Sequence, residues 1–392
     1  MKVRVLASTK VGHIMSKEEA FDFSGKSAGI CYMPDDLDTL FSEQPEKTQR
    51  RANGTLNSGH FSVFGHPHYN LAFEEIPKIL AMVLNNEKLY NTSEKSARYT
   101  KMQPSPEEKE LYEKWIEIYK EEILKMYPNF DDKRALKLAQ ENARYLISVF
   151  TPATVMEYTV DFEQLNFILY WMEEYINNEP DYIRTDAYKP GKENVFVTSL
   201  KNTFRDTLDK LSEFRVKELN TELKGRKLSL FADRKRKEEF GENYCTTYLA
   251  SFAQLAQAQR HRTLSYEISL LEHPEYYVPS IILGTDLEEE WLEDISSLGH
   301  NFPQGMFVEV NERGTIENFV LKCQERLCGY AQLEIQEQTL ATLDNYLWAV
   351  KDDKALHDYL LPYSKGARCT FPSWKCNSPC IFGGKYAMKR RI

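Results

Sequence analysis

The chain has 392 residues, a net charge of −9 and 42% hydrophobic residues. Its length exceeds the roughly 250–300 residues that one hydrophobic core usually serves, so we expect two domains. The hydrophobic content excludes a disordered chain, and the acidic balance argues against a protein that coats nucleic acid. From the acidic balance we expect no nucleic-acid partner. No apolar run approaches the ~20 residues of a membrane helix, so we expect no membrane association either.

The seven cysteines are an odd number spread over the chain, which indicates reduced thiols. The first residues alternate like a strand and lack the apolar stretch of a secretion signal. Both features predict a cytoplasmic protein.

Hydrophobic periodicity predicts the elements of a first domain over residues 1–185. The predicted strands cover 2–7 and 69–73. The predicted helices cover 77–90, 106–126, 132–146 and 162–177.

Residues 186–240 begin with Pro, Gly and charged residues and continue as a charge-rich stretch, which predicts a linker and a solvated helical insertion. A second domain is expected over 241–357, with a helix from Leu249 to Gln259. A cysteine-containing tail, 358–392, ends the chain.

Arg260, His261 and Arg262 form a basic tripeptide directly after this predicted helix. Residues two apart do not share a helix face, so we expect a helix end or loop in which all three side chains point inward. Buried cations need a compensating anion, such as a phosphate or an electron-rich ring. A solvated basic turn is the alternative for the tripeptide taken alone.

Glu94, Ser96 and Arg98 occupy every second position, which places them on one side of an extended segment. A fork-shaped guanidinium beside a hydroxyl group suits the recognition of a phosphomonoester. The alternative is a hairpin edge with an incidental ion pair.

The two segments together resemble the signature of the flavin-dependent thymidylate synthases. Joined, they read Gln-x-x-Arg-His-Arg-x-x-Ser, from Gln257 to Ser265, and then Glu-x-Ser-x-Arg-Tyr, from Glu94 to Tyr99. The resemblance implies the fold class of that family, α+β, with an antiparallel sheet and flanking helices.

Each half of the chain keeps the part of the signature that the other half lacks. The first half has Asn-Glu-Lys at 86–88 in place of Arg-His-Arg, and the second has Ile268 and Leu270 in place of the Glu and Ser. We therefore interpret the chain as a fused pair of diverged repeats. A later match, of 159–161 to 309–311, makes the second repeat shorter by about one helical hairpin.

The resemblance assigns roles to residues of both halves. The cofactor-binding candidates, for FAD, are Arg260, His261, Arg262, Asn311, Arg313 and His66. The substrate-binding candidates are Gln257, Glu94, Ser96, Arg98, Arg144 and Arg326. The catalytic candidates are Arg260, Arg144 and Ser96.

Further family-like elements support these roles. Arg144 ends a Glu-x-Ala-Arg element that binds the pyrimidine ring in the family, where a helix-surface arginine is the alternative. Asn311, Arg313 and Arg326 precede an Ala-Gln-x-Glu-Ile stretch at 331–335, with about four extra residues before Arg326. An ordinary solvated helix and turn is the alternative for these three residues.

His66 lies in Phe-Gly-His, which resembles a Phe-Glu-His element beside the flavin with Gly in place of Glu. A packed or hydrogen-bonded histidine is the alternative.

The reaction that the resemblance implies is reductive methylation of dUMP to dTMP. Methylenetetrahydrofolate would donate the carbon, FAD would carry the hydride and NADPH would reduce it. Because the family's sites form within a homotetramer, we expect a homodimer of this chain that mimics it. Two alternatives stay open, namely a relative that adds another one-carbon group such as hydroxymethyl, and a non-catalytic nucleotide-binding protein.

The tail carries Cys369, Cys376 and Cys380 within a short stretch rich in Pro and Gly. Three thiolates could bind a structural zinc ion, with Cys323, Cys328 or His357 as the fourth ligand. Plain reduced thiols are the alternative, because the spacing is not that of a standard zinc ribbon.

Overall fold

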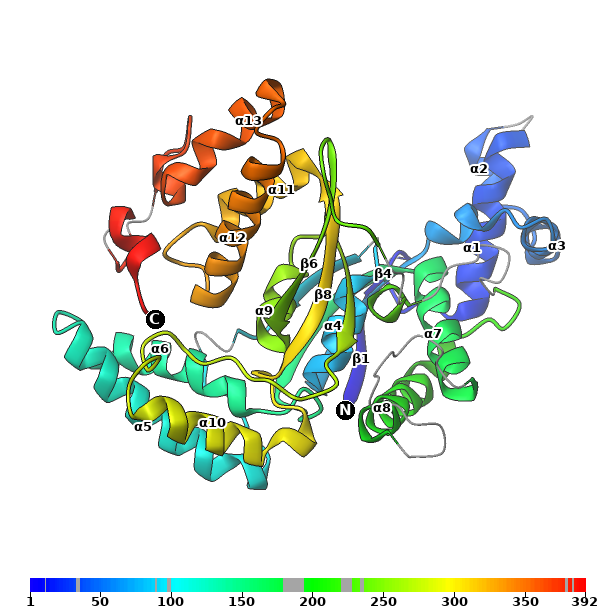
Figure 1. Ribbon diagram of the computed structural model, residues 1–392. Coiled ribbons are helices and arrows are strands. Elements are labelled where there is room, and N and C mark those ends of the chain that lie inside the picture. Colours follow the sequence, from blue (N-terminus) through cyan, green and yellow to red (C-terminus); the bar gives the residue numbers. More distant parts are fainter. Residues whose placement is uncertain are drawn as a thin grey trace. The chain divides into compact units, whose positions relative to one another are not determined.

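The computed structural model describes most of the chain (Figure 1). The described residues are 1–10, 12–32, 36–88, 90–96, 100–178, 194–219, 228–232, 236–377, 380–382 and 384–392. The predicted phosphate ligand Arg98 and much of the predicted linker lie outside them.

The described residues form two compact units. Unit 1 consists of those within 1–95, 152–181 and 193–229, and unit 2 of those within 96–151 and 230–392. This division departs from the two domains expected along the sequence, because residues 96–151 pack with the second half of the chain.

Unit 1 contains a four-stranded antiparallel sheet with the strand order β1-β2-β4-β3. The strands are β1 (Lys2–Ser8), β2 (His68–Ile76), β3 (Tyr90–Glu94) and β4 (Thr154–Asp161). The helices of this unit are α1 (Lys17–Gly29), α2 (Leu37–Phe41), α3 (Pro45–Asn57), α4 (Lys78–Asn86), α7 (Phe162–Asn177) and α8 (Val195–Leu211).

Unit 2 contains a second four-stranded antiparallel sheet, with the order β5-β6-β8-β7. The strands are β5 (Glu239–Phe240), β6 (Asn243–Ser251), β7 (Ser265–Leu270) and β8 (Phe307–Thr315). The helices are α5 (Pro106–Met126), α6 (Asp132–Ala143), α9 (Phe252–Ala258), α10 (Leu287–Ser297), α11 (Ile316–Arg326), α12 (Leu333–Ala349) and α13 (Lys354–Leu360).

The two sheets of the described residues repeat one topology. In each, a short helix (α4 or α9) joins the second strand to the third, and a helix (α7 or α11) follows the fourth strand directly. Among the described helices, α5 and α6 lie between β3 and β4, whereas α10 alone lies between β7 and β8. The predicted fold class, α+β with antiparallel sheets and flanking helices, is confirmed.

The register corrects one match between the two halves. Asp161 pairs with His68 at the end of β4 and caps α7, and Thr315 pairs with Asn243 at the end of β8 and caps α11. Asp161 therefore corresponds to Thr315 and not to Asn311, which lies four residues earlier. The sequence match misplaced it because a strand offers no local mark of register.

Two helices, α5 and α7, begin and end at the residues that the sequence predicted, and local signals explain why. Ser105 forms a capping box with Glu108, and Pro106 occupies the first turn, so α5 begins where its apolar spacing begins. Asp161 caps α7 by accepting a hydrogen bond from the Gln164 backbone N–H over 2.7 Å. Both helices match their predicted ranges.

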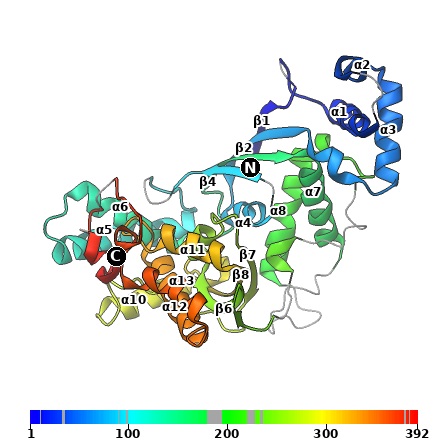
Figure 2. The same cartoon turned by 90° about the horizontal axis from the view of Figure 1, so that it is seen from above.

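Several elements differ from prediction, among them the helix expected over 77–90, which ends at Asn86 before β3 begins at Tyr90. The expected helix from Leu249 begins only at Phe252, because residues up to Ser251 pair with β8 and Ser251 then caps α9. The charged stretch after the linker begins with α8, whose Phe196, Leu200 and Phe204 are buried. Because α8 packs beside α7 in unit 1 (Figure 2), it is not a solvated insertion.

The core of unit 2 explains why residues 96–151 belong to it. Trp115 of α5 packs edge-on against Trp291 of α10, with ring centroids 4.9 Å apart, and both side chains are fully buried. Lys114 and the Trp115 indole N–H reach the Asp294 carboxylate over 2.6 and 2.7 Å. Aromatic packing thus joins α5 to α10.

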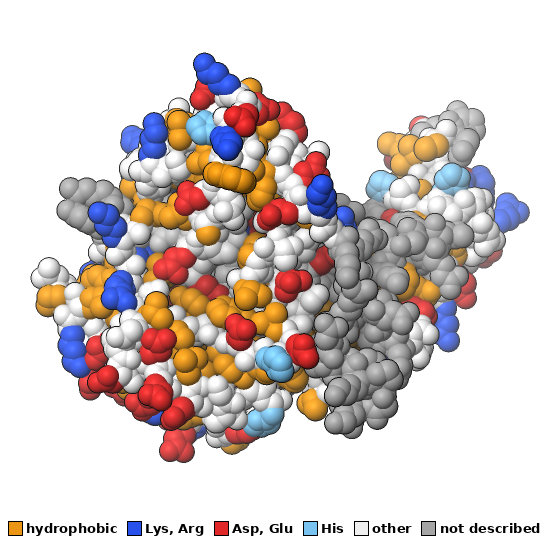
Figure 3. Space-filling view, in the orientation of Figure 1, with side chains coloured by type: hydrophobic (Ala, Val, Ile, Leu, Met, Phe, Trp, Pro, Cys, Tyr) orange, Lys and Arg blue, Asp and Glu red, His pale blue; other side chains and the backbone are white. Residues whose placement is uncertain are grey.

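None of the described helices is long and apolar enough to cross a membrane. On the visible face, the described acidic and basic side chains are interspersed (Figure 3).

Candidate functional site

The basic tripeptide lies in the turn between α9 and β7 of unit 2. His261 is buried with 3% exposure, whereas Arg260 and Arg262 are exposed. The expectation that all three side chains point inward is therefore wrong. Of the three side chains, only that of the central residue, His261, is packed in the core.

His261 is held by Arg326 at the end of α11. Arg326 Nε donates a hydrogen bond to His261 Nε2 over 2.7 Å, and Arg326 Nη2 donates to the Gln257 carbonyl oxygen over 3.2 Å. Burial, helped by the charges of Arg326 and Lys322, lowers the pKa of His261 from its ordinary 6.5 to about 2. The histidine is therefore neutral, and the positive charge beside it belongs to the half-buried Arg326.

Arg144 and Gln257, predicted from opposite halves of the chain, meet on one amide group in unit 2. Arg144 Nη2 donates to Gln332 Oε1 over 2.6 Å, and Gln257 Nε2 donates to the same oxygen. Arg144 is 6% exposed, and among the described residues its Nε is buried without a hydrogen-bond partner. A buried guanidinium with an unused N–H is prepared to bind a further acceptor.

Gln332 is oriented by a chain of buried groups. Its Nε2 donates to the Tyr145 hydroxyl, which donates to Glu334 Oε2 over 2.8 Å. The Ser251 backbone N–H and hydroxyl group also donate to the Glu334 carboxylate, over 2.8 and 2.7 Å. Burial raises the pKa of Glu334, although these hydrogen bonds oppose the rise. The chain fixes which Gln332 atom faces Arg144.

A cavity of about 610 Å³ opens on the sheet of unit 2 beside the basic turn. Arg313 lines it together with Arg236, Lys237, Thr263 and Ser265. The buried Glu267 carboxylate pairs with both Arg313 and Arg236, the latter over 3.2 Å. Two guanidinium groups are thus held at the cavity wall by one acid.

Asn311 lies on β8, two residues before Arg313, and is not among the described residues that line this cavity. Its side-chain amide donates to Cys245 Sγ over 3.2 Å and to the Thr247 hydroxyl over 3.1 Å. Its contacts are therefore with the neighbouring strand, β6.

Three predicted residues lie around the unit boundary or in unit 1. Glu94 accepts a hydrogen bond from Lys78 Nζ over 2.6 Å, and its side chain is 4% exposed. Ser96 begins unit 2, and its carbonyl accepts from the Thr100 N–H. His66 is exposed, and its carbonyl oxygen bonds to a ring nitrogen of His68 over 2.9 Å.

The predicted zinc ligands do not form a metal centre within the described part of the chain. No group of three or more His, Cys, Asp or Glu residues there is arranged to hold a metal ion. Cys369 and Cys376 are exposed, whereas Cys380 is partly buried against Gly329.

Sequence reasoning missed several residues of this region. In the sequence, Gln332 and Glu334 stand out only as part of the stretch that places Arg326, and no motif singles out Tyr145. Arg236 and Lys237 were assigned to a solvated insertion. The only sequence feature of these two residues is that they alternate with acidic residues. That pattern occurs on solvated surfaces as well as in cavity walls, so it does not predict a cavity.

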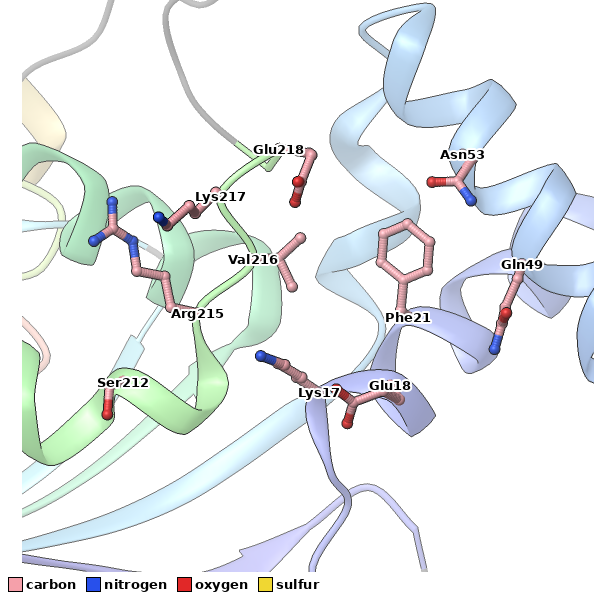
Figure 4. Close-up of a pocket in the computed structure, with 10 residues that line it drawn as sticks. All are labelled: Lys17, Glu18, Phe21, Gln49, Asn53, Ser212, Arg215, Val216, Lys217 and Glu218. Atoms are coloured by element: carbon pink, nitrogen blue, oxygen red, sulfur yellow. The ribbon is translucent and has the colours of Figure 1, made fainter.

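A second cavity of about 610 Å³ lies within unit 1, between α1, α3 and residues 212–218 (Figure 4). Phe21 and Val216 form its apolar centre, and Asn53 faces them from α3. Arg215 lines it as well but is paired with the Glu173 carboxylate over 2.7 Å. The predicted site residues are not among its described lining residues.

The fold is α+β. Next to the turn between α9 and β7, the side chains of Arg144 and Gln257 bond to Gln332, and Arg326 bonds to the Gln257 backbone. Residues 15–168 match the model of the family described as thymidylate synthase complementing protein. The resemblance to the flavin-dependent thymidylate synthases is thereby confirmed for that part of the chain.

Two solved structures are similar at low identity. One is a UMP/dUMP methylase, PolB, from Streptomyces cacaoi bound with 5-Br dUMP, with 14% identity over 55% of this chain and 91% of that chain and a TM-score of 0.32. The other is the flavin-dependent thymidylate synthase ThyX from Helicobacter pylori complexed with FAD and dUMP, with 12% identity over 92% and 97% and a TM-score of 0.19. No curated protein matches.

Proposed function

We propose that the protein is a flavin-dependent thymidylate synthase-like enzyme that methylates dUMP reductively to dTMP. Methylenetetrahydrofolate is the carbon donor and NADPH the reductant in this proposal. The observation that carries it is the meeting of Arg144 and Gln257 on Gln332 Oε1, beside the pair of Arg326 and His261. Arg144, Gln257 and Arg326 were assigned to one nucleotide site, and His261 to the adjoining flavin site, from motifs that are far apart in the sequence.

The buried cluster suits a pyrimidine ring. Arg144 Nε, which has no partner among the described residues, can donate to a uracil carbonyl oxygen. A guanidinium at that position stabilises negative charge that develops on the ring, so no enzyme thiol is required for activation. Gln257 presents its amide beside Arg144. Glu94, Ser96 and Arg98 are proposed to hold the phosphate and sugar, and Arg326 and Arg260 to complete the nucleotide site.

The cavity lined by Arg313 suits the anionic part of FAD. Its lining includes two guanidinium groups, an ammonium group and several hydroxyl groups, which are donors for phosphate oxygens, against one carboxylate, Glu239. Arg262, which directly precedes its lining residue Thr263, would add a further cation at the rim. A bound flavin would supply the hydride. His261, Asn311 and His66 remain proposed flavin contacts.

The repeated strand order supports a fused pair of repeats, in which each half contributes groups that the other lacks. We propose a homodimer that mimics the tetramer of the family. The tail cysteines are proposed as thiols, with a structural zinc ion as the alternative.

The test is to purify the full chain and record its absorbance spectrum, then to assay the products from dUMP with methylenetetrahydrofolate and NADPH. A yellow flavoprotein that forms dTMP supports the proposal. Formation of a hydroxymethyl nucleotide would indicate the related one-carbon reaction. A colourless protein that binds dUMP without turnover would indicate the non-catalytic alternative.

A further inference from the structure

Glu312 of β8 and Lys322 of α11 form an ion pair in the core of unit 2. Both side chains are 0% exposed, and Lys322 Nζ lies 2.6 Å from Glu312 Oε2. The hydroxyl groups of Tyr244 and Tyr248, on β6, donate to the two oxygens of this carboxylate over 2.8 and 2.6 Å. Burial first, and the Glu312 charge second, raise the pKa of both tyrosines, so both hydroxyl groups keep the protons that they donate. The carboxylate is therefore compensated by one cation and two hydroxyl groups.

The fold of the sheet does not require this ion pair, because unit 1 has uncharged side chains at the same two places. Glu312 precedes the cap of α11 by three residues, as Tyr158 precedes the equivalent cap of α7. Lys322 follows the cap of α11 by seven residues, as Ile168 follows that of α7. Tyr158 and Ile168 are buried, with 1% exposure each. Burying two charges costs solvation free energy that their attraction returns only in part. The stability of the sheet alone does not account for the pair.

The pair is linked to α9 through one side-chain amide. Lys322 Nζ donates to Gln338 Oε1, on α12, over 2.9 Å, and Gln254 Nε2, on α9, donates to the same oxygen over 3.2 Å. Gln338 Nε2 donates in turn to Thr342 Oγ1 over 2.7 Å, which fixes the orientation of the amide. Gln254 lies three residues, about one helical turn, before Gln257. Lys322 therefore helps to set where α9 presents Gln257.

The pair also lies beside the basic turn. Lys322 is four residues before Arg326 on α11, so both side chains lie on one side of this helix. Arg326 donates to His261 Nε2, and the charge of Lys322 is among the causes that lower the pKa of His261. Because Glu312 anchors Lys322 to β8, this part of α11 cannot rotate without separating a buried ion pair. The pair thus ties the Arg326 end of α11 to the sheet.

We propose that Glu312 and Lys322 are a positioning pair for the proposed nucleotide site. They hold α9 and α11 at the spacing at which Arg326 Nη2 donates to the Gln257 carbonyl oxygen over 3.2 Å. Neither residue of the pair touches the nucleotide in this proposal, and both act through the two helices. The role in nucleotide binding rests on the proposed function, whereas the effect of the pair on the bond from Arg326 to His261 does not.

The test uses the full chain with Lys322→Met and Glu312→Gln combined, which removes both charges and leaves no single buried charge. The first measurement is the nitrogen NMR signal of His261 Nε2 in histidine-labelled protein, which moves when this nitrogen loses its hydrogen bond. The second is the affinity for dUMP by calorimetric titration. We expect the signal to move and the Kd for dUMP to rise about tenfold, the scale of one lost hydrogen bond.

Lys114→Met combined with Asp294→Asn is the matched control. It removes an equal pair of charges from the same unit, where Lys114 Nζ lies 2.6 Å from the Asp294 carboxylate between α5 and α10. We expect this control to unfold at a lower urea concentration, with the His261 signal and the dUMP affinity unchanged.

Gln338→Leu is a second variant, which keeps the ion pair and removes only its link to α9. It tests the proposal in a chain whose core charges are intact, so it serves if the double variant does not fold. We expect it to weaken dUMP binding in the same direction as the double variant. Unchanged dUMP affinity in Gln338→Leu, together with an unchanged His261 signal, would overturn the proposal.

The remaining outcomes separate the positioning pair from the proposed function. An unchanged His261 signal in the folded double variant overturns the proposal, as does an equal change in the control. If the signal moves as expected but the wild-type chain does not bind dUMP, the effect of the pair on the basic turn stands and the proposed function fails. If the wild-type chain and the double variant bind dUMP equally well, the proposed function stands and the positioning pair is rejected.

Discussion

Arg326 donates from Nε to His261 Nε2 over 2.7 Å, although both side chains carry basic groups. A guanidinium can only donate, so His261 Nε2 must accept and the imidazole must carry its proton on Nδ1. The low pKa of His261 follows from burial first and from Arg326 and Lys322 second. The basic turn thus places a neutral hydrogen-bond acceptor, not a cation, in the core.

This arrangement predicts an acid-labile fold. The unfolded chain takes up a proton on His261 near pH 6.5, whereas the folded chain does so only near pH 2. Below pH 6.5 the unfolded state binds more protons, so the free energy of unfolding falls as the pH drops. At pH 5 the loss from this residue is about 2 kcal/mol. Urea denaturation at pH 7 and pH 5 measures it.

His261→Gln is the control, because its amide oxygen can still accept from Arg326 and does not titrate. The variant should lose less stability than the wild type between these two pH values. An equal loss in both proteins would show that His261 does not cause it.

The second prediction concerns the chain from Glu334 to Arg144. Tyr145→Phe removes the hydroxyl group that links Gln332 to Glu334, and both partners are buried. We expect a loss of about 1–3 kcal/mol in the free energy of unfolding. We also expect weaker dUMP binding, because Gln332 is no longer held toward Arg144. Denaturation and calorimetric titration measure the two effects.

Tyr346→Phe gives the matched comparison. Tyr346 is fully buried in the same unit, and its hydroxyl group donates to the Gly241 carbonyl oxygen. It should reduce stability without changing dUMP affinity. Similar affinity losses in both variants would mean that Tyr145 has a structural role only.

The third prediction is that flavin binding depends on the second half of the chain. Arg262→Ala should remove bound flavin, because Arg262 lies next to the cavity lined by Arg313. Lys88→Ala, at the equivalent position after α4, should retain it. The absorbance of the purified variants is the measurement, and equal flavin loss from both would contradict a divided site.

The fourth prediction is that dUMP affinity depends on Arg98. Arg98→Ala should weaken binding by about 2–3 kcal/mol, the scale of a charge-assisted interaction that is lost. Calorimetric titration that shows unchanged dUMP affinity would exclude Arg98 as the phosphate ligand.

The sequence predicted elements whose signals are local. Helices α5 and α7 were placed to the residue because a cap and apolar spacing occur together at each start. The α8 helix was misjudged because its frequent charges obscured apolar residues at helical spacing, which bury one face. The register of β8 was missed because pairing with β6 is decided by a distant segment.

The site was predictable only in part for the same reason. Arg144 and Gln257 were chosen from separate motifs, and nothing local indicates that Gln332 joins them. Burial of His261 between two exposed arginines depends on the position of Arg326, which comes from another helix. Partners that lie far apart in the chain become visible only when the fold is known.

The last prediction is a stoichiometry, which distinguishes a fused pair of repeats from a single decayed gene. The Arg-His-Arg tripeptide occurs only in the second half and the Ser-x-Arg-Tyr segment only in the first, so each chain supplies one complete set. We expect about one FAD and one dUMP per chain at saturation, in a homodimer with two sites. Flavin absorbance against protein concentration gives the ratio, and light scattering gives the mass. Two flavins per chain would indicate two intact repeats, and none would indicate a decayed scaffold. A monomer with one tightly bound flavin would contradict the dimer but not the division of the motifs.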